Sequence, residues 1–250
     1  ELAEQYGTGN EKGDTKITLG TGACTLTNIG SDLISSKSAL TALSFVYKGK
    51  PQYSFECLTA FAGATISWIE NNLNLINDPN DSERISLELE DNGGVYVIPA
   101  FAGLSAPYWL PSAKAMFYGI TAATNFKHIV RASLESVAYQ IAAYLEYIQK
   151  NEKIDISKII IDGGMTNNSF LMQLISNLSQ KEISIPLFPD MSSYGSLLMG
   201  LIGSGKCKNL DELEQFRVES RSFFPAKDER SISDFTTWKE IIDKHFVNIS

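Results

Sequence analysis

The feature that most constrains the fold is a run of isoleucines that stops at two consecutive glycines. Five isoleucines fall within residues 154–161, and Gly163 and Gly164 follow shortly after them. Apolar residues then recur at helical spacing from Phe170 to Leu178. Since β-branched residues favour strands and glycines allow a tight turn, this stretch predicts a strand, a turn and a helix.

A turn of this kind can serve two purposes. Glycine has no side chain, so the backbone can come close to a bound group, and the free N–H groups at a helix start can face that group. Nucleotide sites use both properties. An ordinary strand-to-helix turn also uses glycine to avoid steric clashes, and the turn taken alone leaves both interpretations open.

Composition excludes several classes of partner. The chain has 250 residues, enough for one large or two small domains, and a net charge of −8. This charge argues against nucleic acid and anionic membranes as partners. The three cysteines form no CxxC pair, which is typical of a reducing, cytoplasmic environment. With only two histidines, a histidine-based metal site is nearly excluded, and no apolar run is long enough to span a bilayer.

The first residues suggest that the sequence is a piece of a longer protein. It begins with Glu1 rather than Met, and residues 1–6 have the pattern of a helix that ends at Gly7. We therefore expect the chain to begin inside a helix of a larger protein.

Strand and helix patterns alternate along the rest of the chain, which predicts an α/β fold. The predicted order is a hairpin at 15–29 turning at Gly20–Gly22, a helix across the apolar positions of 55–76, a polar loop at 77–81, a strand at 94–99, a structured loop with a hairpin at 100–123, a helix at 126–150, the strand and helix around the Gly-Gly turn, a strand at 183–188, a buried helix at 192–205, an irregular connector at 208–230 and a terminal helix at 231–247.

Four blocks of sequence resemble one family in the same order and with similar spacing. They are Gly20-Thr21-Gly22, the run from Gly94 to Trp109 (GVYVIPAFAGLSAPYW), the run from His128 to Gln140 (HIVRASLESVAYQ) and the run from Asp162 to Asn168 (DGGMTNN). Together they resemble the glycerol-kinase branch of the FGGY carbohydrate kinases, over about residues 16–205.

The resemblance implies a fold, a domain and a reaction. The fold would be an RNase-H-like domain of the actin, Hsp70 and sugar-kinase type, with a mixed sheet flanked by helices. Residues 1–205 would be the C-terminal, nucleotide-binding domain, and residues 206–250 an extension that packs on it. The full enzyme would use ATP and Mg²⁺ to phosphorylate a sugar or polyol. Expected partners are ATP or ADP, the sugar or polyol and the N-terminal domain, and a homo-oligomer is compatible with the sequence.

The resemblance also implies where the catalytic base lies. The family's catalytic Asp precedes the hairpin by the length of a helix, so it is expected before Glu1, outside this chain. Asp14 is not that residue, because it lies directly against the hairpin strand.

Five residues are implied to bind the nucleotide. Thr21 would contact the phosphates, Gly63 and Ser67 would lie near the nucleotide on one helix face, and Gly164 and Asn167 would approach the adenosine. Ser67 departs from the family's Gln and is too short to replace its reach.

Simpler roles compete with several of these assignments. Thr21 could belong to a plain hairpin turn, and Gly63 could serve close helix packing. Asn167 could cap the following helix, and Asp162 could cap the turn rather than contact a ligand. His128 is expected at the surface or as a cap at the start of its helix.

The acceptor site departs from glycerol kinases. Cys24 stands where they place a Phe against glycerol, and Leu110 stands where they have Asp. A smaller side chain leaves more room, so a larger polyol or sugar is expected. Tyr108 and Trp109 could stack on a sugar, but we expect them to pack in the core under a loop.

Two other functions remain open. The chain could be a non-catalytic nucleotide-binding domain of the actin/Hsp70 type. It could also be an interaction domain that has lost nucleotide binding.

Overall fold

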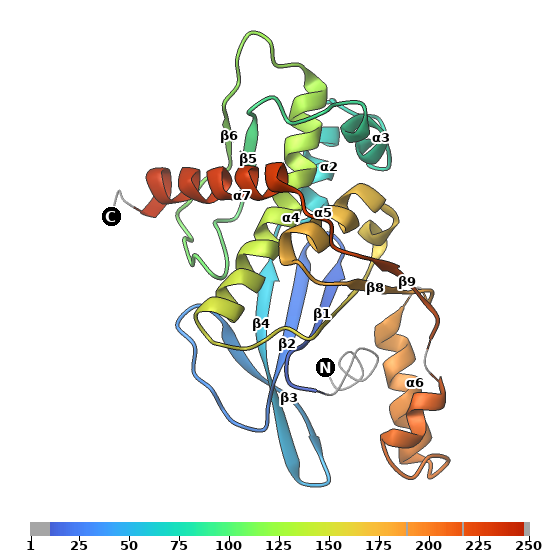
Figure 1. Cartoon of the computed structure of the whole chain (residues 1–250). Helices are drawn as coiled ribbons and strands as arrows, with labels where there is room; N and C mark the ends of the chain where they lie inside the picture. The colour runs from blue at the N-terminus through green and yellow to red at the C-terminus, as the bar shows by residue number, and fades with distance from the viewer. Residues whose placement is uncertain (1–10, 189, 217, 248–250) are drawn as a thin grey trace.

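A computed structural model describes residues 11–188, 190–216 and 218–247 of the chain (Figure 1). The predicted helix over residues 1–6 lies outside these ranges. The elements are β1 (Asp14–Leu19), β2 (Ala23–Gly30), β3 (Leu40–Tyr47), β4 (Lys50–Thr59), α2 (Gly63–Asn71), α3 (Asp81–Leu87), β5 (Tyr96–Ile98), β6 (Met116–Tyr118), α4 (Phe126–Lys150), β7 (Lys158–Asp162), η1 (Gly164–Asn167), α5 (Ser169–Ser179), β8 (Ile183–Pro186), α6 (Met191–Gly203), η2 (Asp211–Phe216), β9 (Ser220–Phe223), α7 (Glu229–Ile242) and η3 (Asp243–Val247).

A mixed sheet forms the centre of the molecule. Within the described residues it has seven strands in the order β3-β4-β2-β1-β7-β8-β9. The strands from β3 to β1 pair antiparallel, whereas β7 pairs parallel with both β1 and β8. β5 and β6 form a separate two-stranded sheet. The predicted α/β class with a mixed sheet is therefore confirmed.

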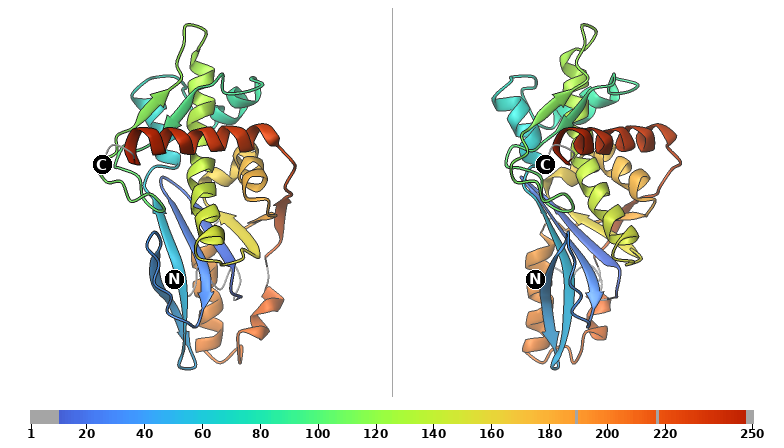
Figure 2. Two further views of the ribbon diagram at one scale, coloured as in Figure 1. Left: turned by 60° about the vertical axis from the view of Figure 1, so that its left-hand side comes forward. Right: turned by 90° about the vertical axis from the view of Figure 1, so that its left-hand side faces the viewer.

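Helices α4 and α5 cover one face of this sheet. Alternate residues of β1 and β7, such as Ile17 and Ile161, point into the core that these helices close, and both side chains are fully buried. Figure 2 shows α6 on the other side of the sheet from α4 and α5. The isoleucine run is thus buried because β7 lies in the interior of the sheet, between β1 and β8.

The first hairpin and the long helix form as predicted. β1 and β2 pair from Thr15 opposite Thr27 to Leu19 opposite Ala23, and the chain turns at the glycines between them. α4 has the predicted bounds of residues 126–150. The Asn125 side chain accepts a hydrogen bond from the Lys127 amide at 2.9 Å, and the Asn125 amide donates to Nδ1 of His128 at 3.1 Å. The predicted capping role of His128 is confirmed.

The predicted helix over residues 55–76 is wrong outside residues 63–71, where α2 forms. Residues 50–59 form β4, which pairs with both β2 and β3, and helix α2 begins only at Gly63. Phe55 and Cys57 are buried on the core side of the strand, two residues apart. This alternation fits a strand, and a few apolar positions matched the helical period by coincidence. β3, which pairs with β4, lies in a stretch for which no element was predicted.

Helix α6 is less buried than predicted. Met191, Gly195 and Leu198 are its buried residues, whereas Leu197 is 59% exposed. The helix packs in a small cluster of its own with Cys207 rather than in the main core.

The C-terminal segment joins the sheet and the helical layer. Part of the predicted irregular connector forms β9, which pairs antiparallel with β8 at the sheet edge. On α7, the fully buried Trp238 donates from Nε1 to the Val97 carbonyl at 2.8 Å. The division of the chain at residue 205 stays a prediction. No helix among the described residues combines the length and the apolar character needed to cross a membrane.

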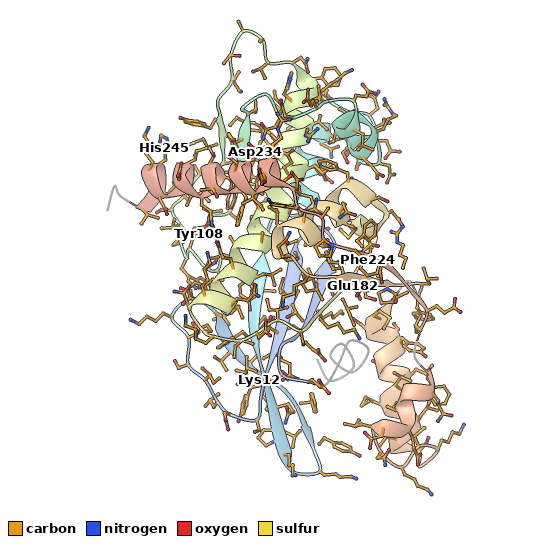
Figure 3. The ribbon with its side chains drawn as sticks, in the orientation of Figure 1. Lys12, Tyr108, Glu182, Phe224, Asp234 and His245 are labelled. Atoms are coloured by element: carbon orange, nitrogen blue, oxygen red, sulfur yellow. The ribbon has the colours of Figure 1, made fainter. Side chains whose placement is uncertain are left out.

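Tyr108 and Trp109 differ in their surroundings. The Tyr108 ring lies edge-on to Trp238 with centroids 6.2 Å apart, so its predicted core packing agrees with the structure. Figure 3 labels Tyr108 in the region beside α7. Burial raises the pKa of the Tyr108 phenol well above its ordinary value. Trp109 is 44% exposed and donates from Nε1 to the Ser38 carbonyl at 2.9 Å. The prediction of core packing for Trp109 is therefore wrong.

Candidate functional site

A pocket of about 490 Å³ brings the predicted nucleotide residues together. It lies between the β1–β2 turn, α2, α3 and the Gly-Gly turn. Its lining residues are Gly20, Thr21, Gly63, Ile66, Ser67, Pro79, Asn80, Ser82, Glu83, Gly164, Met165, Asn167 and Asn168. All five predicted residues are in this set, and Cys24 is not. That they contact a nucleotide stays a prediction.

The turn and the start of α2 are joined by three backbone hydrogen bonds. The Ala62 and Ala64 amides donate to the Thr21 carbonyl at 3.1 and 2.9 Å, and the Gly63 amide donates to the Gly20 carbonyl at 3.0 Å. A Cβ on Gly63 would lie 2.6 Å from the Gly20 carbonyl oxygen. The close-packing interpretation of Gly63 therefore holds, and the same packing fixes the turn against the pocket.

The amides of the turn itself remain available. Among the described residues, no protein group accepts a hydrogen bond from the Thr21 or Gly22 amide. Thr21 is exposed, and its hydroxyl has no hydrogen bond within that part of the chain. Adjacent free amides and a hydroxyl on a glycine turn suit an anion such as phosphate.

Gly163 and Gly164, in the turn after β7, are glycines for different structural reasons. Gly163 has a φ of +99°, and a Cβ there would lie 2.2 Å from the Leu19 carbonyl oxygen. Gly163 is thus required by the fold. A Cβ on Gly164 would meet nothing within 4 Å, and Gly164 lines the pocket. Packing therefore does not explain Gly164.

Asp162 forms a buried ion pair instead of capping the turn. Its Oδ2 lies 3.2 Å from Nζ of Lys16, and both side chains are almost entirely buried. The capping alternative for Asp162 is not what the structure shows. Since Lys16 is on β1 and Asp162 ends β7, this pair joins the two parallel strands that lead into the two glycine turns of the site.

Asn168 rather than Asn167 caps α5. The Asn168 Oδ1 accepts from the Leu171 amide at 2.9 Å, so the capping alternative for Asn167 is wrong. Asn167 is exposed and lines the pocket beside Gly164. Its amide can donate and accept hydrogen bonds, as recognition of a nucleoside requires.

Helix α3 forms one wall of the pocket and was not predicted from the sequence. Oε1 of Glu83 accepts from the Ser169 and Phe170 amides at 2.9 and 3.2 Å, and so joins α3 to the start of α5. Residues 77–81 were predicted only as a polar loop. The acidic residues Asp81 and Glu83 are a typical helix start and could have indicated α3.

A buried ion pair on α4 holds this wall in place. Nε of Arg131 lies 2.8 Å from Oε1 of Glu135, and the same guanidinium donates to the Ser86 carbonyl at 3.1 Å. Burial raises the pKa of the Glu135 carboxyl, and the hydrogen bond from Arg131 opposes that shift. The pair therefore fixes the end of α3 against α4.

The described residues contain no ready-made metal centre. Within them, no three His, Cys, Asp or Glu side chains gather where they could hold an ion. Mg²⁺ needs no such cluster, because it is usually bound by one or two carboxylates together with water and substrate phosphates.

Solved structures share this architecture. A Plasmodium falciparum glycerol kinase with ADP superposes with a TM-score of 0.87 at 28% identity, covering 97% of this chain and 48% of that one. A xylulose kinase from Lactobacillus acidophilus gives a TM-score of 0.80 at 18% identity, over 94% and 49% of the two chains, and shows the fold alone. The protein is therefore a mixed α/β domain with the actin-like ATPase fold.

The chain belongs to the FGGY family of carbohydrate kinases, whose C-terminal domain matches residues 15–204. A glycerol kinase from Clostridium perfringens strain SM101 is 39% identical over 235 residues, which is 93% of this chain and 47% of that protein. One from Francisella tularensis subsp. novicida is 36% identical over 94% of this chain and 47% of that protein. The chain thus spans about half the length of these relatives and corresponds to their C-terminal half.

Proposed function

We propose that the chain is the nucleotide-binding half of an ATP-dependent carbohydrate or polyol kinase. One observation carries the proposal: Thr21, Gly63, Ser67, Gly164 and Asn167, which lie on three separate segments, line one pocket. Its volume of about 490 Å³ falls in the range usual for small-molecule sites. The similar P. falciparum glycerol kinase was solved with ADP, which supports the same ligand here.

We propose one arrangement of the nucleotide in this pocket. The phosphates would accept hydrogen bonds from the Thr21 and Gly22 amides, while the adenosine would lie over Gly164 beside Asn167. The space that a side chain at Gly164 would occupy is open, so the flat base can approach the backbone there. The Ser67 side chain would reach less far toward the nucleotide than the Gln that the family has at this position.

The chain's share of the reaction is positioning. The γ-phosphoryl group would pass from ATP to an acceptor hydroxyl, with Mg²⁺ on the phosphates and the proton-accepting Asp outside this chain. Thr21 and the turn amides would hold the phosphates in line with the acceptor. Closure against the N-terminal domain would exclude water.

Cys24 is the residue that we propose for the acceptor side. It lies on β2 opposite Leu58 of β4, outside the nucleotide pocket, and its Sγ is 3.8 Å from Oε1 of Glu56. Ala23, its neighbour, points into the core, so Cys24 is on the sheet face away from that core. A thiol there leaves more room than a phenyl ring, and we expect an acceptor larger than glycerol.

In the full-length kinase, Cys24→Phe should shift specificity toward glycerol. One pocket-wall contact is worth about 1–3 kcal/mol of discrimination, so the ratio of kcat/KM values for glycerol and five-carbon polyols should rise about tenfold. The measurement is kcat/KM for both acceptors in both variants. Efficient use of glycerol alone by the unsubstituted enzyme would show that Cys24 does not shape the acceptor site.

Thermal unfolding of the chain with nucleotides tests the nucleotide proposal. A ligand that binds only the folded state at one hundred times its Kd stabilises that state by about 2.7 kcal/mol, so ADP and Mg·ATP should raise Tm, whereas adenine-free pyrophosphate should raise it less. An interaction domain that had lost the site would show no shift with any of these ligands.

A further inference from the structure

The pocket offers two places where a phosphate could bind. One is the Gly20–Gly22 turn, with its available amides. The other is the start of α5, whose capping residue Asn168 lines the pocket and whose first amides lie at the positive end of the helix dipole. A nucleotide could enter with its phosphates at either end, so something must fix its direction.

Two side chains of the protein already accept hydrogen bonds from the first amides of α5. The first two amides of the helix, of Ser169 and Phe170, donate to Oε1 of Glu83, and the Leu171 amide donates to Oδ1 of Asn168. Glu83 comes from a different helix, 86 residues earlier in the chain than Ser169. A carboxylate therefore stands where a phosphate would otherwise bind.

Glu83 also sets the electrostatic polarity of the pocket. It is the only charged side chain among the described residues that line it. A negative charge at the α5 end repels phosphates there, while the uncharged turn at Thr21 keeps its amides free. Both effects favour the same direction for a bound nucleotide.

We infer that Glu83 is a positioning residue that closes the start of α5 to phosphate and so fixes the direction in which the nucleotide lies. The inference rests on the proposed nucleotide site and adds to it the residue that excludes the reversed pose. It requires no contact between Glu83 and the phosphates in the productive pose.

The test uses three variants of the chain and two probes. Glu83→Ala removes both the charge and the cap, and Glu83→Gln removes the charge but keeps an acceptor oxygen for the α5 amides. Asp81→Asn is the matched control, since it removes an acid from the same helix outside the pocket. Each ¹⁵N-labelled protein is titrated with ADP and with inorganic pyrophosphate while the backbone amide signals are followed by NMR.

In the unsubstituted chain and in Asp81→Asn, both probes should perturb the Thr21 and Gly22 amides by contact with phosphate. Pyrophosphate should leave the Ser169 and Phe170 amides unchanged. In Glu83→Ala, pyrophosphate should perturb Ser169 and Phe170 directly, and the ratio of ADP to pyrophosphate affinity should fall about tenfold, as expected for an anion at an opened helix start. In Glu83→Gln, the effect of pyrophosphate on the Ser169 and Phe170 amides should be intermediate between its effects in the unsubstituted chain and in Glu83→Ala.

Failure of the inference and failure of the proposed function give different results. If ADP perturbs no pocket amide in the unsubstituted chain, the proposed nucleotide site is wrong. If ADP binds there but pyrophosphate leaves Ser169 and Phe170 unchanged in both Glu83 variants, the inference is overturned. Should Glu83→Ala lose its folded spectrum, Glu83→Gln decides alone, and identity with the unsubstituted chain would contradict the inference.

Discussion

At Gly163 the backbone turns back from β7 with a φ of +99°, directly against the Leu19 carbonyl. Its neighbour Gly164 has no such constraint and faces the pocket. Gly163 is therefore required by the turn, whereas Gly164 lines the pocket, where we propose that it leaves space for a ligand. A glycine count alone could not assign these roles, because they depend on what lies across the turn.

Alanine substitution should lower the free energy of unfolding much more at Gly163 than at Gly164. Gly163→Ala forces a positive φ and a clash with the Leu19 carbonyl, so it should destabilise the fold by at least about 2 kcal/mol. Gly164→Ala should change the free energy of unfolding by less than about 1 kcal/mol. Urea unfolding of both variants checks this. Equal losses would show that Gly164 is also a structural glycine.

Glu83 shows the limit of sequence reasoning at the residue scale. The glycine turns, Thr21 and Asn167 could be placed because their local sequence is distinctive. The contact between Glu83 and α5 joins residues 86 positions apart, and nothing in the local pattern of either segment indicates it. Tertiary contacts of this kind decide which polar residues reach the pocket.

At the scale of elements, long regular helices and glycine-flanked strands were predictable, and β4 was not. α4 has 25 residues of consistent helical period and an Asn125 cap, so its bounds were clear. In β4, the buried Phe55 and Cys57 alternate with less buried residues, and helix α2 follows a few residues later. The two-residue period of the strand therefore cannot be separated from the helical period that follows it. Strand pairing with β2 and β3 decides the outcome, and the sequence does not display that pairing.

Helix α7 should contribute strongly to stability through one side chain. Trp238 is fully buried against Tyr139 and Phe235, and its Nε1 donates to Val97. Trp238→Ala should cost about 3–5 kcal/mol, because it removes a large buried ring. Trp238→Phe should cost about 1–3 kcal/mol, because the Val97 carbonyl loses its donor.

Chemical denaturation with circular dichroism measures both values. The control is Thr236→Ala on the exposed face of α7, which should stay within about 0.5 kcal/mol of the unsubstituted chain. If Trp238→Ala were as stable as this control, α7 would not be an integral part of the domain.

At the scale of the whole molecule, the FGGY assignment and the half-length match underlie the division of labour that we propose. The chain spans about 47% of the length of its glycerol kinase relatives, and we expect the catalytic base to lie outside it. The sequence order of four motifs was enough to predict the fold class and the family. The identity of the acceptor could not be predicted beyond its expected size, because we propose that the other half of the enzyme supplies most of the acceptor site.

The chain by itself should therefore show no sugar-dependent kinase activity. Loss of a general base alone typically lowers a rate by about 10²–10⁴, and loss of the opposite wall of the cleft also removes substrate positioning. A coupled assay of ADP release with a panel of polyols and ketoses measures this. Robust acceptor-dependent release by the chain would place the base within residues 1–250.

Calorimetric titration of the chain with ADP tests the central claim most directly. The variant is Gly164→Val, whose Cβ would meet nothing within 4 Å and whose branched side chain would fill the space that we propose for the base. The matched control is Gly200→Val on α6, another glycine whose Cβ would meet nothing within 4 Å and which lies outside the pocket. We predict measurable ADP binding by the unsubstituted chain and by Gly200→Val, and affinity reduced at least about tenfold, a loss of about 1.4 kcal/mol or more, in Gly164→Val. Equal ADP affinity in all three proteins would contradict the assignment of this pocket to the nucleotide.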